Sequence, residues 1–259
     1  MMLMSSDGLS LSLEGEAVRL ESFEISGYEI KPQLGRASGS LGAVLHGITL
    51  GQREIKIEGY ISAELEENRR TLAKICTQDK PFFIVDGDYR LEAVASYGPE
   101  LSCQRRFLNK LLKFTLIAKT IAPLWQSKSD KTYIFGNRGG VSSPEESLRV
   151  INEGDSAVGF VLEVQMRTSA DGIMIAKDGE NIDIQRAFSF GDTVIIDTRR
   201  GKKGIMLVSA ETGETTDIID TASLGSTFFE LEVGENVFSY AVRNGISTMT
   251  FRYTPCYLR

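Results

Sequence analysis

The sequence has few of the residues that build metal and redox sites. It contains one histidine, His46, and three cysteines, Cys76, Cys103 and Cys256. One histidine excludes sites made from several imidazoles, and cysteines this far apart form no CxxC motif. A sparse, odd cysteine content is typical of a chain made in a reducing compartment rather than of a disulfide scaffold. We therefore expect no metal site, no cofactor-binding residue and no disulfide framework.

Long hydrophobic runs and basic charge are also scarce. No apolar stretch approaches the roughly 20 residues of a membrane-spanning helix, so no membrane partner is expected. Residues 1–7 (MMLMSSD) lack the basic flank and apolar core of a secretory signal. The 259 residues carry a net charge of −6. That charge argues against specific nucleic-acid binding, which depends on a basic surface that neutralises phosphates.

Alternation of apolar and polar residues dominates the first half of the chain. Segments 9–13, 18–25 and 55–57 alternate in this way, which predicts half-buried strands. A slip in the alternation at Ser22 indicates a bulge. The segment 83–91 (FIVDGDYRL) predicts a hairpin with Asp-Gly in a type I′ turn.

One segment has a helical period instead. In residues 62–78, apolar side chains recur on one face, acidic residues come first and Lys74 comes late, which complements the helix dipole. Ser62 is the expected N-cap. A further strand is expected at 111–118, and polar residues then mark a domain boundary near 125–132.

The second half is expected to be nearly all strand, with Gly, Asp and Asn turns between short apolar segments. Many short strands at this spacing are typical of a β-sandwich or jelly roll. The fold class is therefore mainly β, with a β-rich first domain (1–128) and a sandwich domain (129–259). The expected strands are 148–152, 159–166, 172–176, 181–184, 193–197, 205–208, 227–233, 237–242 and 248–253.

No catalytic residue is predicted. A Ser–His–Asp site would need His46, but the sequence has no Gly-x-Ser-x-Gly elbow, and His46 is interpreted as a loop residue before a strand. A pair of carboxylates for glycoside hydrolysis always exists among 35 acidic residues, so it carries no information. The Gly-rich segment 35–42 lacks the Gly-Lys-Ser/Thr ending of a phosphate loop and is interpreted as a flexible loop.

Two kinds of binding site on the second domain, a sugar site and a site for an acidic partner, have some support in the sequence. Sugar sites usually offer an exposed aromatic platform, but the single tryptophan, Trp125, lies at the domain boundary. The basic cluster 199–203 (RRGKK) suits either an acidic partner or a solvated hairpin tip, and the tip is favoured. Aromatic residues of this domain that alternate along expected strands are expected in the core. The aromatic residues that fall in or beside those strands are Phe160, Phe188, Phe190, Phe229, Tyr240, Phe251 and Tyr253.

Several motifs occur together in an order that resembles siphophage distal tail proteins. Residues 45–59 (LHGITLGQREIKIEG) resemble that family's pair of strands with Gly, Arg and apolar residues at set spacings. The hairpin at 86–90 (DGDYR), which resembles the family's Asp-x-Tyr-Arg hairpin, and the Pro-x-Trp at 123–125 follow in the family's order. Four motifs of the second half also resemble the family: 151–155, 190–198, 228–236 and 253–258.

The resemblance implies a structural protein of a phage or prophage tail tip in a Gram-positive host, made in the host cytoplasm. Such proteins form a hexameric ring through the first domain and join the tail tube protein to the tail-associated hub or lysin protein. The second domain of the family is a galectin-like sandwich that carries receptor-binding proteins in some members. The resemblance transfers no catalytic residue.

Other functions remain open at this point. A carbohydrate-binding sandwich module for adsorption to the host cell wall is the main alternative, and a glycosidase is the weakest. A relative from a contractile tail or a tail-like bacteriocin is also compatible with the motifs.

Overall fold

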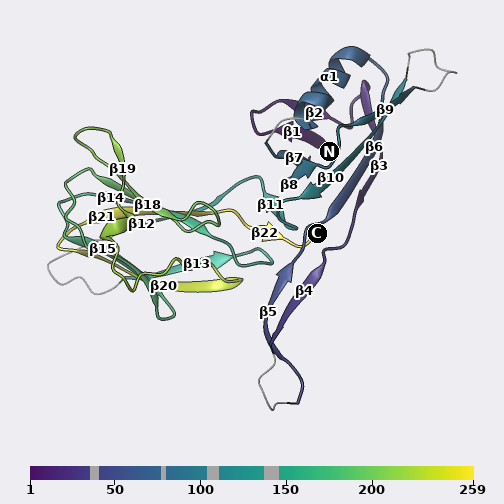
Figure 1. Cartoon of the computed structure of the whole chain (residues 1–259). Coiled ribbons are helices and arrows are strands. Elements are labelled where there is room, and N and C mark those ends of the chain that lie inside the picture. Colours follow the sequence, from purple (N-terminus) through teal and green to yellow (C-terminus); the bar gives the residue numbers. More distant parts are fainter. Residues whose placement is uncertain (36–40, 77–79, 104–110, 137–145) are drawn as a thin grey trace. The chain divides into compact units, whose positions relative to one another are not determined.

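A computed structural model describes residues 1–35, 41–76, 80–103, 111–136 and 146–259 (Figure 1). The chain forms two compact units. The first contains Met1–Lys128 together with Leu258–Arg259, and the second contains Ser129–Tyr257. Antiparallel strands build both units, and within the described ranges α1 (Leu65–Cys76) is the one α-helix. The predicted mainly-β class with a single helix is confirmed.

The first unit is built on one large sheet with strand order β2-β1-β7-β8-β10-β6-β3. Strand β9 pairs with β10, β11 pairs with β8, and β4 and β5 form a separate ribbon. The strands are β1 (Met2–Ser5), β2 (Ser10–Ser12), β3 (Val18–Ile25), β4 (Ile30–Gly35), β5 (Val44–Leu50), β6 (Glu54–Ile61), β7 (Phe82–Asp86), β8 (Tyr89–Ala95), β9 (Glu100–Cys103), β10 (Leu112–Thr120) and β11 (Trp125–Ser127).

Helix α1 packs on β1, β2 and β6 and buries Leu72, Ile75 and Cys76 against the sheet. The predicted helix is therefore confirmed, but the prediction that Ser62 caps it is wrong. The Ser62 hydroxyl instead donates to the carbonyl of Glu16 at 2.7 Å, and this hydrogen bond connects the end of β6 to the turn before β3. The expected end of the helix at residue 78 lies outside the described residues.

The predicted hairpin forms between β7 and β8, and its turn differs from the expected type. Asp86 pairs with Tyr89, so Gly87 and Asp88 are the central residues. Only Gly87 has a positive φ, +57°, which fits a type II′ turn with glycine first rather than type I′. The bulge predicted at Ser22 is confirmed, since the register of β3 against β6 shifts between Leu20 and Ser22.

The second unit contains two sheets, with orders β12-β21-β14-β17-β18-β19 and β13-β20-β15-β16. The elements are β12 (Lys131–Gly136), β13 (Glu146–Asn152), β14 (Phe160–Met166), β15 (Gly172–Lys177), β16 (Glu180–Ile184), β17 (Thr193–Asp197), β18 (Gly204–Val208), β19 (Thr215–Asp217), η2 (Ile219–Thr221), β20 (Gly234–Arg243), β21 (Ser247–Tyr253) and β22 (Cys256–Tyr257).

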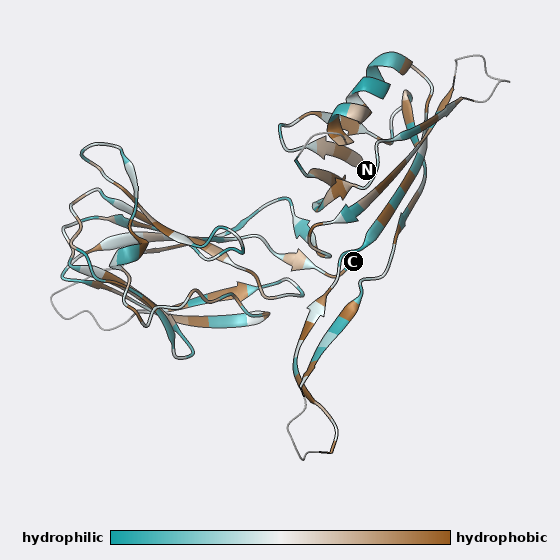
Figure 2. Ribbon diagram, in the orientation of Figure 1, coloured by the Kyte–Doolittle hydropathy of each residue, from teal (hydrophilic) through white to brown (hydrophobic). Residues whose placement is uncertain are grey.

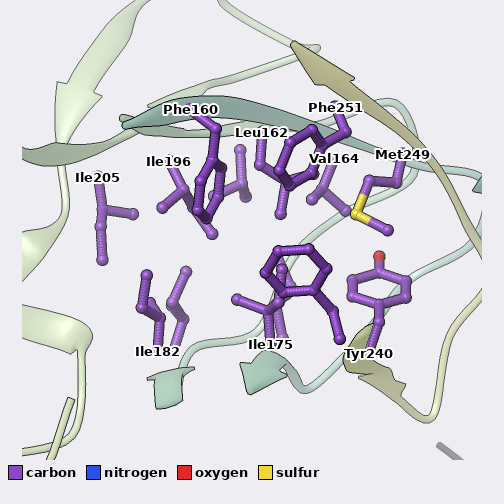
Figure 3. Close-up of a cluster of buried hydrophobic side chains, with 14 of the residues drawn as sticks. Phe160, Leu162, Val164, Ile175, Ile182, Ile196, Ile205, Tyr240, Met249 and Phe251 are labelled. Carbon is purple, nitrogen blue, oxygen red and sulfur yellow. The ribbon is translucent and has the colours of Figure 1, made fainter. Parts of the chain in front are cut away.

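Side chains from both sheets meet in one core, which makes this unit a sandwich (Figure 3). Phe160 of β14 stacks on Phe251 of β21 with ring centroids 4.5 Å apart. Ile175 and Tyr240 face them from the other sheet (Figure 3). Of the seven aromatic residues assessed in the sequence, six are buried, and Phe190 is the exception with 71% exposed in a turn.

The strand expected at 227–233 does not form. Phe229 and Leu231 are buried as the alternation suggested, but the backbone makes only an isolated bridge from Leu231 to Val158. The side-chain amide of Asn236 donates to the Glu232 carbonyl, and its oxygen accepts from the Glu232 amide. The alternation in this segment therefore predicts which side chains are buried, but not a strand. The side chain of Asn236 satisfies backbone groups that a neighbouring strand would otherwise pair with.

Candidate assembly surface

The β4–β5 ribbon, called the arm below, projects from the main sheet of the first unit (Figure 1). It continues the β3–β6 pair, because β4 follows β3 and β5 leads into β6. Backbone hydrogen bonds join the two parts: the Ser26 amide donates to Glu54, and the Gly51 amide donates to Glu29. An isolated two-stranded ribbon is only marginally stable in water, so the arm depends on its base or on a partner surface.

One side of the arm is apolar. Ile30 pairs with Leu50, Pro32 with Ile48 and Leu34 with Leu45, and paired residues two apart share a face. The apolar face is therefore defined by six residues: Ile30, Pro32, Leu34, Leu45, Ile48 and Leu50. Four of them, Ile30, Leu34, Leu45 and Ile48, are exposed, with values from 53% to 61%. Hydrophobic residues along both strands of the arm are visible in Figure 2.

The opposite side of the arm is polar. Lys31, Gln33 and Thr49 define this polar face, and the Gln33 side chain donates to the Thr49 hydroxyl at 3.3 Å. The arm is thus amphipathic, with one face suited to water and one suited to a partner. Exposed apolar patches of this kind mark interaction sites on soluble proteins.

A bulge determines which side chain joins the apolar face. The register shifts so that Leu34 pairs with Leu45 and His46 has no opposite residue. The interpretation of His46 as a loop residue is therefore wrong, since it lies inside β5. Its ring packs over Gly35, where a Cβ would overlap the imidazole. Of the predicted loop 35–42, Gly35 ends β4 and residues 36–40 lie outside the described residues.

The outer face of the main sheet carries a network of charges across β3, β6 and β10. Lys113 lies 2.7 Å from a carboxylate oxygen of Glu21 and 3.5 Å from one of Glu58, and Lys56 lies 3.1 Å from Glu58. The hydrogen bond from Lys113 lowers the pKa of Glu21, and the hydrogen bond from Lys56 lowers that of Glu58. This face is suited to water, in contrast to the apolar face of the arm.

The basic cluster 199–203 of the second unit is partly neutralised by acids of its own unit. Arg199 lies 2.6 Å from Asp197, and Arg200 lies 3.1 Å from Glu230. Burial opposes ionisation of Asp197, but its hydrogen bonds with Arg199 outweigh that effect and lower its pKa. The pairing weakens the case for a polyanion site and supports the solvated-tip interpretation.

Other candidate groups do not come together into a site. In the part of the chain that the structure describes, no cluster of three or more potential metal ligands is present. Cys76, the last residue of α1, is buried, and this burial raises the pKa of its thiol to about 12. Trp125 is buried in the core of the first unit rather than displayed as a sugar platform. The described helix is too short and too polar to cross a membrane.

The arm as a site was not predicted from the sequence. The available signal was the alternation of Ile30, Pro32 and Leu34 and of Ile48 and Leu50. Proline within a strand pattern argues against a central strand and in favour of an edge, which is where β4 lies.

Comparison with known proteins gives a consistent result. Residues 153–257 match the family model described as siphovirus-type tail component, C-terminal domain. The whole chain is similar to the Dit protein (gp 19.1) of SPP1, described as a paradigm of the hub adsorption apparatus in phages that infect Gram-positive hosts. The two are 15% identical, with 99% of each chain covered and a TM-score of 0.70.

Chains from two structures of the phage p2 baseplate in its activated conformation are also similar. The structure with Sr gives 9% identity, 98% and 96% coverage and a TM-score of 0.54. The structure with Ca gives 10% identity, 98% and 97% coverage and a TM-score of 0.55. No curated protein sequence matches this chain significantly. The family model over residues 153–257 therefore confirms the resemblance to siphophage distal tail proteins that scattered motifs carry in the sequence, and the solved structures show that the chain shares their fold.

Proposed function

We propose that this protein is a distal tail adaptor whose first unit closes into a hexameric ring. In this proposal the ring joins the tail tube protein to the tail-tip hub or lysin protein, and its role is structural rather than catalytic. The second unit, a galectin-like sandwich, carries host-adhesion components such as receptor-binding proteins. The family match at 153–257 supports a tail role for that unit.

The observation that carries the proposal is the uncovered apolar face of the arm. A closed ring needs a heterologous interface, in which one surface of each copy meets a different surface of the next. The arm extends away from the sheet of its own unit, and among the described residues of that unit no second layer covers its apolar face. Burying such a face against a neighbouring copy removes apolar area from water, at about 25 cal/mol per Å².

The native mass of the purified full chain tests the ring directly. Six copies of the 28.6 kDa chain give about 172 kDa, which light scattering resolves from the monomer. A mass near the hexamer value is the expected result. A mass of one chain at micromolar concentration contradicts self-assembly through this unit.

Two adjacent substitutions test whether the arm is the interface. Ile48→Lys places a charge on the apolar face, and Thr49→Lys places the same charge on the polar face of the same strand. We expect the first to dissociate the ring and the second to leave its mass unchanged, because only the first buries an unpaired charge in the interface. Equal masses for the two variants contradict the role of the apolar face.

A further inference from the structure

The base of the arm contains a buried arginine held by main-chain oxygens. Arg53 is 6% exposed, and its guanidinium donates to main-chain oxygen atoms. Its Nε donates to the carbonyl of Ser26 at 2.8 Å, where the chain leaves β3 for the arm. Its Nη1 donates to the main-chain oxygen of Arg259. Burial lowers the pKa of Arg53, but a guanidinium stays charged at neutral pH, so these oxygens hold a buried cation.

The backbone of Arg53 is tied to the main sheet. Its amide donates to the hydroxyl of Thr120 at 2.9 Å, and the Thr120 amide donates to the Arg53 carbonyl at 3.0 Å. Thr120 is fully buried at the end of β10. One residue therefore connects the sheet, the start of the arm and the segment Leu258–Arg259.

The side chain of Arg259 continues the connection. Its guanidinium lies 4.3 Å from the centroid of the Tyr89 ring and 5.5 Å from that of Trp125, as in cation–π contacts. It also lies 3.7 Å from a carboxylate oxygen of Asp86. Leu258–Arg259 thus belongs to the first unit, although the residues directly before it belong to the second.

We propose that Leu258–Arg259 is a clasp that fixes the base of the arm through Arg53 and holds the arm in its assembly-competent position. Among the described elements, β4 and β5 contact mainly each other, so the direction of the ribbon depends on the hydrogen bonds at Ser26 and Gly51 and on Arg53 beside them. The contacts of the clasp belong to the first unit alone. Only the proposal that they help assembly rests on the proposed ring.

Two changes in the full chain separate the parts of the clasp. Arg259→Ala removes the contacts with Tyr89, Trp125 and Asp86 but keeps the main-chain oxygen that Arg53 binds. Deletion of Leu258–Arg259 removes both. Arg200→Ala is the matched control, because it removes an exposed, ion-paired arginine of the second unit.

The first measurement uses the single tryptophan, Trp125, which is 4% exposed. Both clasp variants should shift its fluorescence to longer wavelength and increase acrylamide quenching, and Arg200→Ala should not. Unchanged emission and quenching in both clasp variants overturn the contact of Arg259 with this site.

The second measurement is hydrogen exchange at the Ser26 and Gly51 amides in the Ile48→Lys background, with the mass of each sample measured in parallel. Deletion of Leu258–Arg259 should speed exchange at these amides about tenfold or more, because a hydrogen bond to a charged group is lost. If the two proteins have the same native mass and the same exchange rates at these amides, the clasp is overturned, whether that mass is of a monomer or of an oligomer. The proposed ring fails separately, through the mass of the unmodified chain.

Discussion

Apolar side chains alternate along strands in both the sandwich and the arm, but they end in opposite surroundings. In the sandwich, Phe160 and Phe251 stack between two sheets and are fully buried. In the arm, Ile30 and Ile48 follow the same alternation and remain more than half exposed. The difference is the second layer: a sheet face becomes a core only where another element covers it. The same pattern therefore builds stability in one region and an interaction surface in the other.

The largest expected effect is truncation of the sandwich core. Phe160→Ala should lower the free energy of unfolding by about 3–5 kcal/mol, because it removes a ring that touches three other buried rings. Ile48→Ala in the arm should change it by no more than about 0.5 kcal/mol when both proteins are compared as monomers. Urea unfolding followed by circular dichroism measures both, and similar losses for the two variants would break the comparison.

The next largest effect on stability is expected from replacing a glycine of the main sheet, compared with replacing a glycine of the arm. A Cβ on Gly59 would lie 2.7 Å from the Phe114 ring, which is fixed in the core, so Gly59→Ala should cost about 1–3 kcal/mol. A Cβ on Gly35 would meet the His46 ring, but that ring is exposed and can turn away. Gly35→Ala should cost about 0.5 kcal/mol or less. Thermal unfolding of the two variants checks this, and the reverse order would show that the arm is as rigid as the core.

The smallest effect is expected from the charged face of the main sheet. The folded-state pKa values of Glu21 and Glu58 lie below the ordinary 4.5. Their contribution to stability is therefore complete above pH 4.5 and is lost as the pH falls below that value. Lys113→Gln should lower the unfolding midpoint slightly near neutral pH, and by progressively less as the pH falls below 4.5. A pH-independent difference between the variant and the unmodified chain would show that Lys113 acts through packing instead.

Local patterns predicted the sandwich strands well because each one is short and bounded by turn residues. They failed where a side chain replaced a ladder partner, as at 227–233, and where another contact used the expected cap, as at Ser62. The type of the 86–89 turn was missed because pairing of Asp86 with Tyr89 moved the central positions one residue along.

The arm shows the limit of the sequence at the candidate site. The alternation of Ile30, Pro32 and Leu34 is present in the sequence, but a strand of that composition fits a buried sheet equally well. Only the exposure of Ile30 and Ile48 in the tertiary structure identifies the face as a surface.

The sequence by itself determined the mainly-β class, the position of the helix and the resemblance to tail proteins, because period, turn residues and motif order are local properties. The tertiary structure decided the rest. It paired Leu34 with Leu45 through a bulge at His46, left the apolar face of the arm exposed and brought Arg259 to Arg53, 206 positions away. Contacts between residues so far apart depend on the path of the whole chain, and no local pattern specifies that path.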